Sequence, residues 1–307
     1  MRLLQLSDTH LGATWNTRGP AGWCRAADHH EALRAALAPA LRGEVDAVIH
    51  AGDVFDRSRP PTRWMLAAGE LLAEVARRVP VLGIAGNHDR RGIRRWLPHA
   101  SLGFVDRPTR RVLGQGTQRL AVGLVPFVRT AEGFAAAAAT AAGPGVDLLV
   151  IHQAPHGSRV PGLVFRVGAQ RDTIGAEHLP AGVRWVACGH IHPRQAVRLG
   201  PAEVVMGGST ERTAFSEAPQ AKGTVRWRFG ARVSWRFVDH LTRPMADVPG
   251  GLVRCTEEEV AAVRGAGRLA VVRRGTSGAR ATRPARRRGA VELGPLFGRG
   301  AQSSPGR

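Results

Sequence analysis

The sequence predicts an α/β fold in which layers of helices and strands are stacked on one another. Two patterns in the chain predict it. In the first half, short apolar runs typical of buried strands alternate with stretches of helical periodicity. In the second half, short strands with alternating side chains dominate. This distribution favours a layered α/β sandwich over a doubly wound nucleotide-binding fold.

The expected strands are short apolar or alternating runs that end at glycine or polar residues. They lie at 2–6, 45–50, 79–84, 147–151, 184–188, 195–199, 203–206, 224–229 and 232–238, with a hairpin-like pair over 110–125. The last two strands alternate aromatic with basic residues, as a half-exposed sheet edge does. A polar connector that can hold a short helix fills residues 156–180.

Three helices are expected between these strands. Asp28 is predicted to be the N-cap of a helix over about residues 29–42. Leucines recur in it at helical spacing, at Leu33, Leu37 and Leu41. A proline pair at 60–61 is expected to open a second helix that continues to about residue 78. The alanine run 135–142 predicts a third, weakly amphipathic helix.

The chain of 307 residues is long enough for one large α/β domain or two smaller ones, and its formal net charge is +20. Lys222 is the single lysine among 44 basic residues, a bias that a GC-rich coding sequence produces whatever the protein does. Residues 264–307 hold eleven arginines and one acid, Glu292, so about half of the excess charge lies in this segment. The remainder is moderately basic, which fits either compositional bias or a polyanionic substrate.

Cysteine usage and hydropathy indicate a cytoplasmic protein that has no contact with a membrane. Cys24, Cys188 and Cys255 show no CxxC spacing, which argues against a disulfide framework and fits a reducing compartment. The first apolar run meets Asp8 too early to be a signal peptide. No run reaches the roughly 18 apolar residues that a transmembrane helix needs.

Polar residues with metal-binding side chains follow five of the expected strands directly. They are Asp8 and His10, Asp53, Asn87 and His88, His152, and His190 and His192. Loops at the carboxyl ends of strands gather at one edge of an α/β sheet, where such folds place their ligands. Two of the pairs have i, i+2 spacing, which in extended backbone points both side chains the same way. Glycines at 52, 86 and 189 allow tight turns at these positions.

Without His88, this set offers two aspartates, one asparagine and four histidines. Mixed carboxylate, amide and imidazole ligands suit divalent ions such as Mn, Fe or Zn better than calcium. Seven ligands are too many for one tetrahedral site but suit two metal ions that share a carboxylate. We therefore expect a dinuclear metal centre at the carboxyl ends of the strands.

A two-metal centre turns a bridging water into hydroxide near neutral pH and clamps the oxygens of a phosphoryl group. Phosphodiester or phosphomonoester hydrolysis is therefore the expected reaction. His88 follows the predicted ligand Asn87 and is not needed as a ligand itself. It is placed to donate a proton to the leaving oxygen or to stabilise the phosphorane-like charge. Asp89 is expected to orient an imidazole by accepting its second N–H.

Each motif has an ordinary structural interpretation when it is taken singly. An aspartate after a strand is usually a helix cap, and a single His-x-His is more often a surface pair than a ligand pair. Five such motifs at strand ends in one chain favour the metal centre. The other histidines lie outside the pattern: His50 is expected to be a hydrogen-bonded core residue, and His29, His30, His99, His156, His178 and His240 are expected to face solvent.

The motifs DTH, GDVFD, GNHD, HQ and GHIH, in this order, resemble the calcineurin-like metallophosphoesterase superfamily. The resemblance covers residues 3 to about 240 and implies an α/β/β/α sandwich. It also implies the role of each position. Asp8, His10 and His192 would hold one metal ion; Asn87, His152 and His190 would hold the other; Asp53 would bridge them, and His88 would be the catalytic histidine.

Further residues resemble the DNA-repair nuclease branch of the superfamily, which holds the bacterial SbcD subunit. They are the motif at 52–56 with Arg59-Pro60-Pro61, and Gly208 to Arg212 with Phe215-Ser216-Glu217 and Lys222-Gly223. This resemblance implies a Mn-dependent nuclease that trims DNA ends and pairs with an SMC-like ATPase. Asp56 stands where archaeal and eukaryotic relatives typically have histidine, so the chain is closer to the bacterial form. Asp56 and Asp89 are both expected to support the ligands.

Three parts of the chain are expected: a catalytic domain over 1–240, a truncated or vestigial cap over 241–274, and an Arg/Gly/Ala-rich tail over 275–307. Thr256 to Glu259 has a capping-box pattern for a short helix, and 269–274 is expected to be a strand. The tail is either a disordered solvated end or an arginine-rich segment that binds phosphates.

Three functions remain open from the sequence. The first is a DNA exonuclease or endonuclease in repair. The second is a phosphodiesterase or phosphatase for nucleotides or small phosphoesters, which the shortened cap favours. The third is a non-catalytic scaffold that binds a partner, against which the complete ligand set argues. The sequence predicts no oligomeric state.

Overall fold

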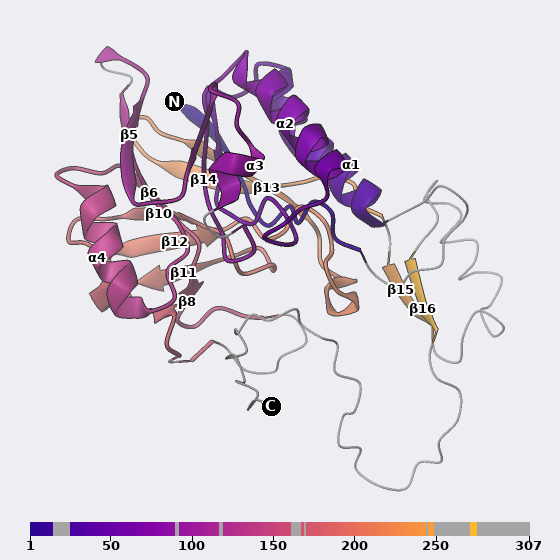
Figure 1. Ribbon diagram of the computed structural model, residues 1–307. Helices are drawn as coiled ribbons and strands as arrows, with labels where there is room; N and C mark the ends of the chain where they lie inside the picture. The colour runs from indigo at the N-terminus through magenta and orange to yellow at the C-terminus, as the bar shows by residue number, and fades with distance from the viewer. Residues whose placement is uncertain are drawn as a thin grey trace, which may run out of the picture.

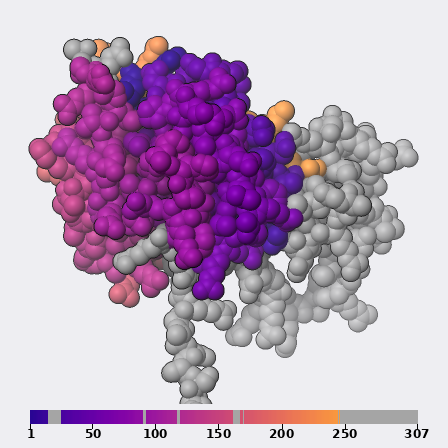
Figure 2. Space-filling model, turned by 45° about the horizontal axis from the view of Figure 1, so that its top comes forward, coloured from indigo at the N-terminus to yellow at the C-terminus, as the bar shows by residue number. Residues whose placement is uncertain are grey.

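The computed structural model describes residues 1–14, 25–89, 92–116, 119–160, 167–168, 170–243, 245–248 and 271–274. Two six-stranded sheets form its centre, and helices flank them (Figure 1). Residues from the first and the middle parts of the chain share one continuous face of the molecule (Figure 2).

The first sheet has the strand order β14-β13-β1-β2-β3-β4. Its strands are β1 (Arg2–Leu6), β2 (Ala47–His50), β3 (Val81–Ile84), β4 (Leu102–Val105), β13 (Gly223–Arg228) and β14 (Ser234–Asp239). Strands β1 to β4 are parallel, so their carboxyl ends lie at the same edge. Strand β13 pairs antiparallel with both β1 and β14.

The second sheet has the strand order β11-β12-β10-β7-β6-β5. Its strands are β5 (Thr109–Leu113), β6 (Leu120–Val125), β7 (Leu148–Ile151), β10 (Trp185–Cys188), β11 (Gln195–Leu199) and β12 (Ala202–Met206). The four inner strands are parallel and the two edge strands are antiparallel to them. Two small pairs complete the described strands: β8 (Ala154–Pro155) with β9 (Thr173–Ile174), and β15 (Met245–Val248) with β16 (Val271–Arg274).

Helices cover the outer face of each sheet. They are α1 (Arg25–Leu41), α2 (Thr62–Ala76), α3 (Ile93–Trp96) and α4 (Ala131–Ala142), with short 3-10 helices η3 (Ala176–His178) and η4 (Phe215–Glu217). Helices α1 and α2 pack on the first sheet, where Leu33 and Leu72 share a cluster with Leu4. Helix α4 packs on the second sheet through Phe134, in a cluster with Leu149. The expected α/β/β/α sandwich is confirmed.

Side-chain alternation explains why the inner strands are apolar at successive positions. Leu4 and Val48 point to the helices, whereas the preceding residues Leu3 and Ala47 point to the core between the sheets. Ile49 lies in that inner core with residues of the second sheet such as Val150. Because both faces of each inner strand are covered, apolar side chains are stabilised on both sides.

The structure corrects two local expectations at helix α1 and adds two elements that were not predicted. Helix α1 begins at Arg25, so Asp28 lies in its first turn instead of capping it, and its carboxylate accepts from Arg25 at 3.0 Å. His29 is fully buried and does not face solvent. Helix α3 and strand β4 were not predicted, although β4 continues the parallel order of the first sheet beyond β3.

Several expectations fall on parts of the chain that the structure does not describe. The predicted helix at 256–259, the tail 275–307 and two of the three cysteines lie outside the described residues. The expected strand at 269–274 is present as β16 over Val271–Arg274. Among the helices of the described segments, none is both long enough and apolar enough to span a membrane.

Candidate metal centre

Polar side chains from five loops converge at one edge of the sandwich. Each loop follows a strand: β1, β2 and β3 of the first sheet, and β7 and β10 of the second. In that order the loops hold Asp8 and His10, Asp53, Asn87 and His88, His152, and His190 and His192. The two sheets meet directly here, because the backbone N–H of His190 donates to both carboxylate oxygens of Asp8 at 3.1 Å. All the predicted ligands therefore lie in one cluster.

Four of these residues have a backbone conformation that only glycine adopts easily. The φ angles of Asp8, His10, Asp53 and His190 are 52°, 44°, 55° and 79°, and no other described non-glycine residue has a positive φ. The left-handed conformation costs an L-residue about 1–2 kcal/mol. Among the described non-glycine residues, this strained conformation occurs in this cluster alone. The surrounding fold therefore holds these four residues in a strained backbone, which places their side chains at the cluster.

Asp8, His10 and His192 form one group of potential ligands. Nε2 of His10 lies 3.2 Å from Nε2 of His192, and Oδ1 of Asp8 lies 3.9 Å from the same His192 atom. One ligand atom from each of the three lies within 4.8 Å of the other two. Asp8 and His10 are buried, whereas the side chain of His192 is 20% exposed. The group is thus open to solvent on the His192 side.

Asn87, His152 and His190 form a second group. Oδ1 of Asn87 lies 2.9 Å from both Nε2 of His152 and Nδ1 of His190. Nδ1–H of His152 donates to the carbonyl of Ala51 at 2.7 Å, which directs Nε2 into the cluster. The ring of Phe127 lies beside both imidazoles, at 6.2 and 5.8 Å between centroids. No sequence pattern indicates this aromatic contact.

Asp53 lies between the two groups. Its Oδ2 is 3.4 Å from Nε2 of His152 and 3.9 Å from Nε2 of His10. Burial alone would raise the pKa of Asp53, but positive charge on His152 and His88 holds it well below its ordinary value. Burial likewise opposes charge on His152, yet Asp53 and Asp8 raise the pKa of His152 to about 9. Asp53 is therefore the anionic centre of the cluster.

The donor chemistry of the cluster fits divalent cations. His152 donates Nδ1–H to a carbonyl, and Nδ1 of His192 lies 2.9 Å from the acceptor Oε1 of Glu217, so each ring directs Nε2 inward. These nitrogens face the acceptor atoms Oδ1 of Asn87 and Nε2 of His10. Acceptor atoms that converge in this way need a proton or a cation between them. When a metal ion binds, it takes the place of the proton, which is released.

His88 lies at the solvent-facing side of the cluster, with its side chain 24% exposed. Its Nδ1–H donates to the carbonyl of Asp56 at 2.5 Å. Its Nε2 lies 3.9 Å from Oδ2 of Asp53, and its ring meets that of His10 edge to face at 4.8 Å between centroids. The second nitrogen of His88 therefore lies on the side of the ring that faces the cluster, near Asp53.

Asp89 supports the cluster differently from the way the sequence predicts. Its carboxylate accepts from the backbone N–H groups of Phe55, Val54 and Gly86, at 2.9, 3.0 and 3.1 Å, instead of orienting an imidazole. It thereby ties the loop after β2 to the loop after β3, next to Asp53. Burial first, and then the charge of Asp53, raises the pKa of Asp89 to about 6.

Asp56 lies close to two imidazoles. Its Oδ1 is 3.9 Å from Nδ1 of His10, and its carbonyl accepts from His88. Nδ1 of His10 is buried and has no hydrogen-bond partner among the described residues. The expected support of the ligands by Asp56 stays a prediction, and this geometry gives it a specific target in His10.

Two glycines allow the loops to approach this closely. A Cβ at Gly86 would lie 2.1 Å from Oδ1 of Asp53, and a Cβ at Gly189 would lie 2.2 Å from the carbonyl oxygen of Ala51. The Gly189 Cβ would also lie 2.8 Å from Nδ1 of His152. Both distances are far below van der Waals contact, so any side chain there would displace a predicted ligand or its support.

Several supporting side chains were missed in the sequence. His29 and His50 hold Thr9 between the two ligands of the first loop: Nδ1–H of His29 donates to its carbonyl at 2.9 Å, and Nε2 of His50 lies 3.2 Å from its hydroxyl. His50 is buried and hydrogen-bonded as predicted. No sequence pattern marks His29.

Glu217 and Lys222 lie behind His192, and only their place in the nuclease-branch motifs could have drawn attention to them.

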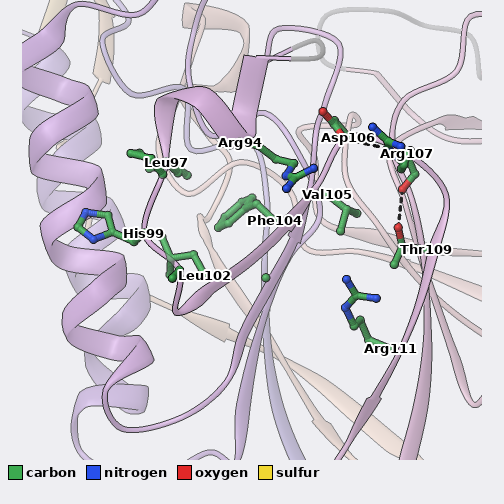
Figure 3. A pocket seen from close by; sticks show the side chains of 13 residues that line it. Arg94, Leu97, His99, Leu102, Phe104, Val105, Asp106, Arg107, Thr109 and Arg111 are labelled. Atoms are coloured by element: carbon green, nitrogen blue, oxygen red, sulfur yellow. Dashed lines mark hydrogen bonds and ion pairs between the residues drawn. The ribbon is translucent and has the colours of Figure 1, made fainter.

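A basic hollow lies away from the cluster, where α3, β4 and β5 meet (Figure 3). It has a volume of about 440 Å³ and shares no lining residue with the predicted metal centre. Arg94, Arg107 and Arg111 line it, with Asp106 as the only acid among its lining residues. The side chain of Phe104 forms part of its floor.

The chain is similar in sequence to DNA-repair proteins of archaea and to a bacterial nuclease. It is 28% identical to the DNA double-strand break repair protein Mre11 of Methanosarcina mazei, over 71% of this chain and 34% of that protein. It is 27% identical to the Mre11 of Saccharolobus solfataricus, over 67% of this chain and 53% of that protein. With the SbcD component of the nuclease SbcCD from Bacillus subtilis it shares 26% identity, over 78% of this chain and 69% of that protein.

The chain thus spans between a third and about half of the length of these two archaeal relatives. A family model described as calcineurin-like phosphoesterase matches residues 1–194, which is more than half of the chain and includes all five loops of the cluster. The chain therefore belongs to the calcineurin-like phosphoesterase family of metal-dependent hydrolases.

Proposed function

We propose that this protein hydrolyses phosphodiester bonds in DNA with the help of two divalent metal ions. One observation carries the proposal: six potential ligands converge around a seventh, the buried carboxylate of Asp53, with His88 beside them. A scaffold that only binds a partner has no need of such a complete set. Relatives named as DNA-repair proteins and as a nuclease subunit favour DNA over a small phosphoester.

In the proposal, the ligands divide between two ions. Asp8, His10 and His192 would hold one ion, and Asn87, His152 and His190 would hold the other. Asp53 would contact both, because its Oδ2 lies near ligands of each group. Manganese is the proposed metal, with iron or zinc as alternatives that suit the same donors. When bound, the two ions activate water at neutral pH and offset the charge of the phosphoryl group.

His88 is the proposed proton donor. Because its Nδ1–H is held by the carbonyl of Asp56, Nε2 is the atom that exchanges a proton with solvent or substrate. It is one of the less buried side chains of the cluster. In the proposed reaction, Nε2–H of His88 donates to the leaving oxygen as the phosphodiester bond breaks.

DNA and an SMC-like ATPase are the proposed partners. The name of the Bacillus subtilis relative makes it one subunit of a nuclease, which favours a second subunit for this chain as well. The moderately basic body of the chain suits a polyanion, since electrostatic attraction to phosphates supplies most of the nonspecific affinity for DNA.

One assay discriminates the three functions. Purified protein is incubated with Mn²⁺ and either linear DNA or bis-p-nitrophenyl phosphate, beside the His88→Ala variant. Cleavage of DNA supports the proposal; hydrolysis of the small ester alone supports a small-phosphoester enzyme; neither activity supports a scaffold. His88→Ala should lower turnover about 100-fold or more while retaining the bound metal. Full activity of this variant would overturn the role given to His88.

A further inference from the structure

A buried carboxylate lies directly behind one of the predicted ligands. Oε1 of Glu217 is 2.9 Å from Nδ1 of His192, and the hydroxyl of Thr213 is 2.8 Å from the same nitrogen. The side chain of Glu217 is 2% exposed. Because a carboxylate only accepts hydrogen bonds, Nδ1 of His192 must be the donor, and its Nε2 is then directed toward His10 at 3.2 Å.

The charge of this carboxylate is compensated by Lys222. Its Nζ lies 2.6 Å from Oε2 of Glu217 and 2.7 Å from the hydroxyl of Ser209. The lysine side chain is 1% exposed, so both members of the pair are removed from water. Its Nζ also lies 3.4 Å from the carbonyl oxygen of His192, and thus touches the backbone of the ligand whose ring Glu217 holds.

The composition of the chain makes Lys222 distinctive. It is the single lysine among 44 basic residues, so arginine occupies every other basic position. An ammonium is compact, whereas the planar guanidinium of arginine is wider and donates in a fixed fork. Four oxygen atoms of the described residues surround Nζ within 3.4 Å. Such a compact shell of acceptors suits an ammonium better than a planar guanidinium.

Two other imidazoles of the cluster are held by main-chain atoms. His152 donates to the carbonyl of Ala51, and His88 donates to the carbonyl of Asp56. His192 differs from both, because its outer nitrogen is held by a side-chain carboxylate. A carboxylate fixes the tautomer and also raises the basicity of the ring as a ligand.

We propose that Glu217 is a positioning residue whose carboxylate, neutralised by Lys222, fixes the ring of His192 so that Nε2 faces the metal centre. The proposal rests on the metal centre proposed above. It assigns a purpose to two residues of the nuclease-branch motifs, which follow β12 and do not belong to the ligand set. It also means that the binding of one of the two proposed metal ions, the one that His192 would hold, depends on this pair.

Two variants test the pair. Glu217→Gln keeps the shape of the side chain but removes its charge, which leaves Lys222 charged and buried. The double variant Glu217→Gln/Lys222→Met removes both charges, and replacing a buried pair by neutral groups usually preserves the fold. Glu211→Gln is the matched control, because Glu211 is also buried in the same loop. Its carboxylate pairs with Arg25 at 3.1 Å and accepts from the backbone N–H groups of Arg212 and Arg243, so its partners are arginines and not a predicted ligand.

The first measurement is made on metal-free protein. Nitrogen-15 NMR of labelled histidine reports which ring nitrogen carries the proton. We expect the Nδ1–H tautomer of His192 in the wild type and in Glu211→Gln, and a mixture of tautomers in both Glu217 variants. A purely structural role for Glu217 would leave the tautomer unchanged in the folded double variant, and that result would overturn the proposal.

The second measurement is calorimetric titration with Mn²⁺. We expect one of two bound equivalents to weaken about 10- to 100-fold in the Glu217 variants while the other is retained. Lys222→Arg should weaken the same equivalent, because the wider side chain displaces Glu217. Equal affinities in wild type and folded double variant would overturn the proposal. If the wild type bound no Mn²⁺, the proposed metal centre would fail, whereas the tautomer of His192 would still decide the role of Glu217.

Discussion

Glycine at position 86 determines how closely the loops after β2 and β3 approach each other. Its φ is not in the left-handed region, so the limit on substitution is space alone, and a Cβ would meet Oδ1 of Asp53 at 2.1 Å. Gly86→Ala should therefore displace the carboxylate that contacts both groups of ligands. We expect turnover to fall about 100-fold, because displacements of the order of 1 Å have such effects.

Gly168→Ala is the matched control for this substitution. A Cβ at Gly168 meets no atom of the described residues within 4 Å, and its φ also lies outside the left-handed region. We expect this variant to bind Mn²⁺ and to turn over as the wild type does. Wild-type Mn²⁺ affinity and turnover in Gly86→Ala would show that Asp53 has more freedom than its contacts indicate.

The positive φ angles of the cluster predict a difference between two substitutions at His190. Its φ is 79°, a value that alanine tolerates poorly and glycine adopts freely. Both substitutions remove the imidazole, so they differ mainly in backbone strain. Without metal, His190→Gly should be more stable than His190→Ala by about 1 kcal/mol. Urea unfolding of the two variants measures the difference.

His156 supplies the comparison for this measurement, because it is exposed and its φ is not positive. There the order should reverse, with alanine as stable as glycine or more so. If His190→Ala equalled or exceeded His190→Gly in stability, the backbone of the cluster would not be strained.

The convergence of the candidate ligands could be predicted from the sequence because their positions follow from a local rule: each comes directly after an apolar strand. Their supports could not be predicted, since they depend on tertiary contacts. Asp89 stands next to His88 in the sequence, yet it binds backbone amides of a different loop. Glu217 reaches His192 across 25 residues of chain. His29 is buried because of the residues that α1 packs against, which its local sequence does not reveal.

Strands were predictable where both faces of the sheet are covered by apolar layers. Runs such as Val81–Ile84 and Leu148–Ile151 are buried at every position and stand out by composition alone. In strand β4, Leu102–Val105, only the last two residues are buried, and the strand lies at the edge of its sheet. Its conformation is determined by pairing with β3, so its residues taken alone indicate a strand only weakly.

The two sheets are linked in the core by a polar side chain of β1. Nε2 of Gln5 donates to the carbonyl of Val205 in the second sheet at 3.0 Å, and its Oε1 accepts from the indole N–H of Trp227 at 2.7 Å. Gln5 is fully buried. Gln5→Leu would leave the indole N–H of Trp227 unpaired, which costs about 1–3 kcal/mol.

Urea unfolding followed by tryptophan fluorescence measures this cost. Gln195→Leu is the control, because Gln195 makes its hydrogen bonds at the exposed edge of the second sheet. We expect Gln195→Leu to change stability by about 0.5 kcal/mol or less. A loss in Gln5→Leu no larger than in this control would show that water or a shift of Trp227 replaces the lost bonds.

Two buried histidines make the stability of the whole molecule depend on pH. Burial lowers the pKa of both His29 and His50 from 6.5 to about 3. Between these values the unfolded chain binds protons that the folded chain does not, so the free energy of unfolding falls as the pH drops below about 6.5. Each histidine should contribute a loss of about 2 kcal/mol between pH 8 and pH 5.

His29→Asn isolates one of these contributions, since the amide N–H of asparagine can replace Nδ1–H in the bond to Thr9. Asp89 has the opposite effect on stability: its pKa is raised to about 6 in the folded state, so a fall in pH favours folding there. This contribution is the same in both proteins and cancels in the comparison. Denaturant unfolding at pH 8 and pH 5 should therefore show a loss about 2 kcal/mol smaller in His29→Asn than in the wild type. An equal loss in both would mean that His29 becomes protonated in the folded state.

The basic hollow beside β4 and β5 is a candidate site for a polyanion, apart from the candidate metal centre. Arg94, Arg107 and Arg111 outnumber its one acid, Asp106, and the hollow is about 440 Å³ in volume (Figure 3). If DNA is the substrate, these side chains should contact its phosphates. Each lost contact reduces the slope of log affinity against log salt by about 0.9 on duplex DNA.

A triple alanine variant at these arginines should therefore bind DNA more weakly and with a shallower salt dependence. The control removes the same charge from exposed arginines on α1, β11 and β13, namely Arg34, Arg198 and Arg228. Both variants lower the net charge of the protein equally, so a general attraction of DNA to a basic protein would reduce both slopes alike. If the slope falls only in the hollow variant, phosphates bind in the hollow. The slope reports the counterions that direct contacts with phosphates release, so it falls only where such contacts are lost.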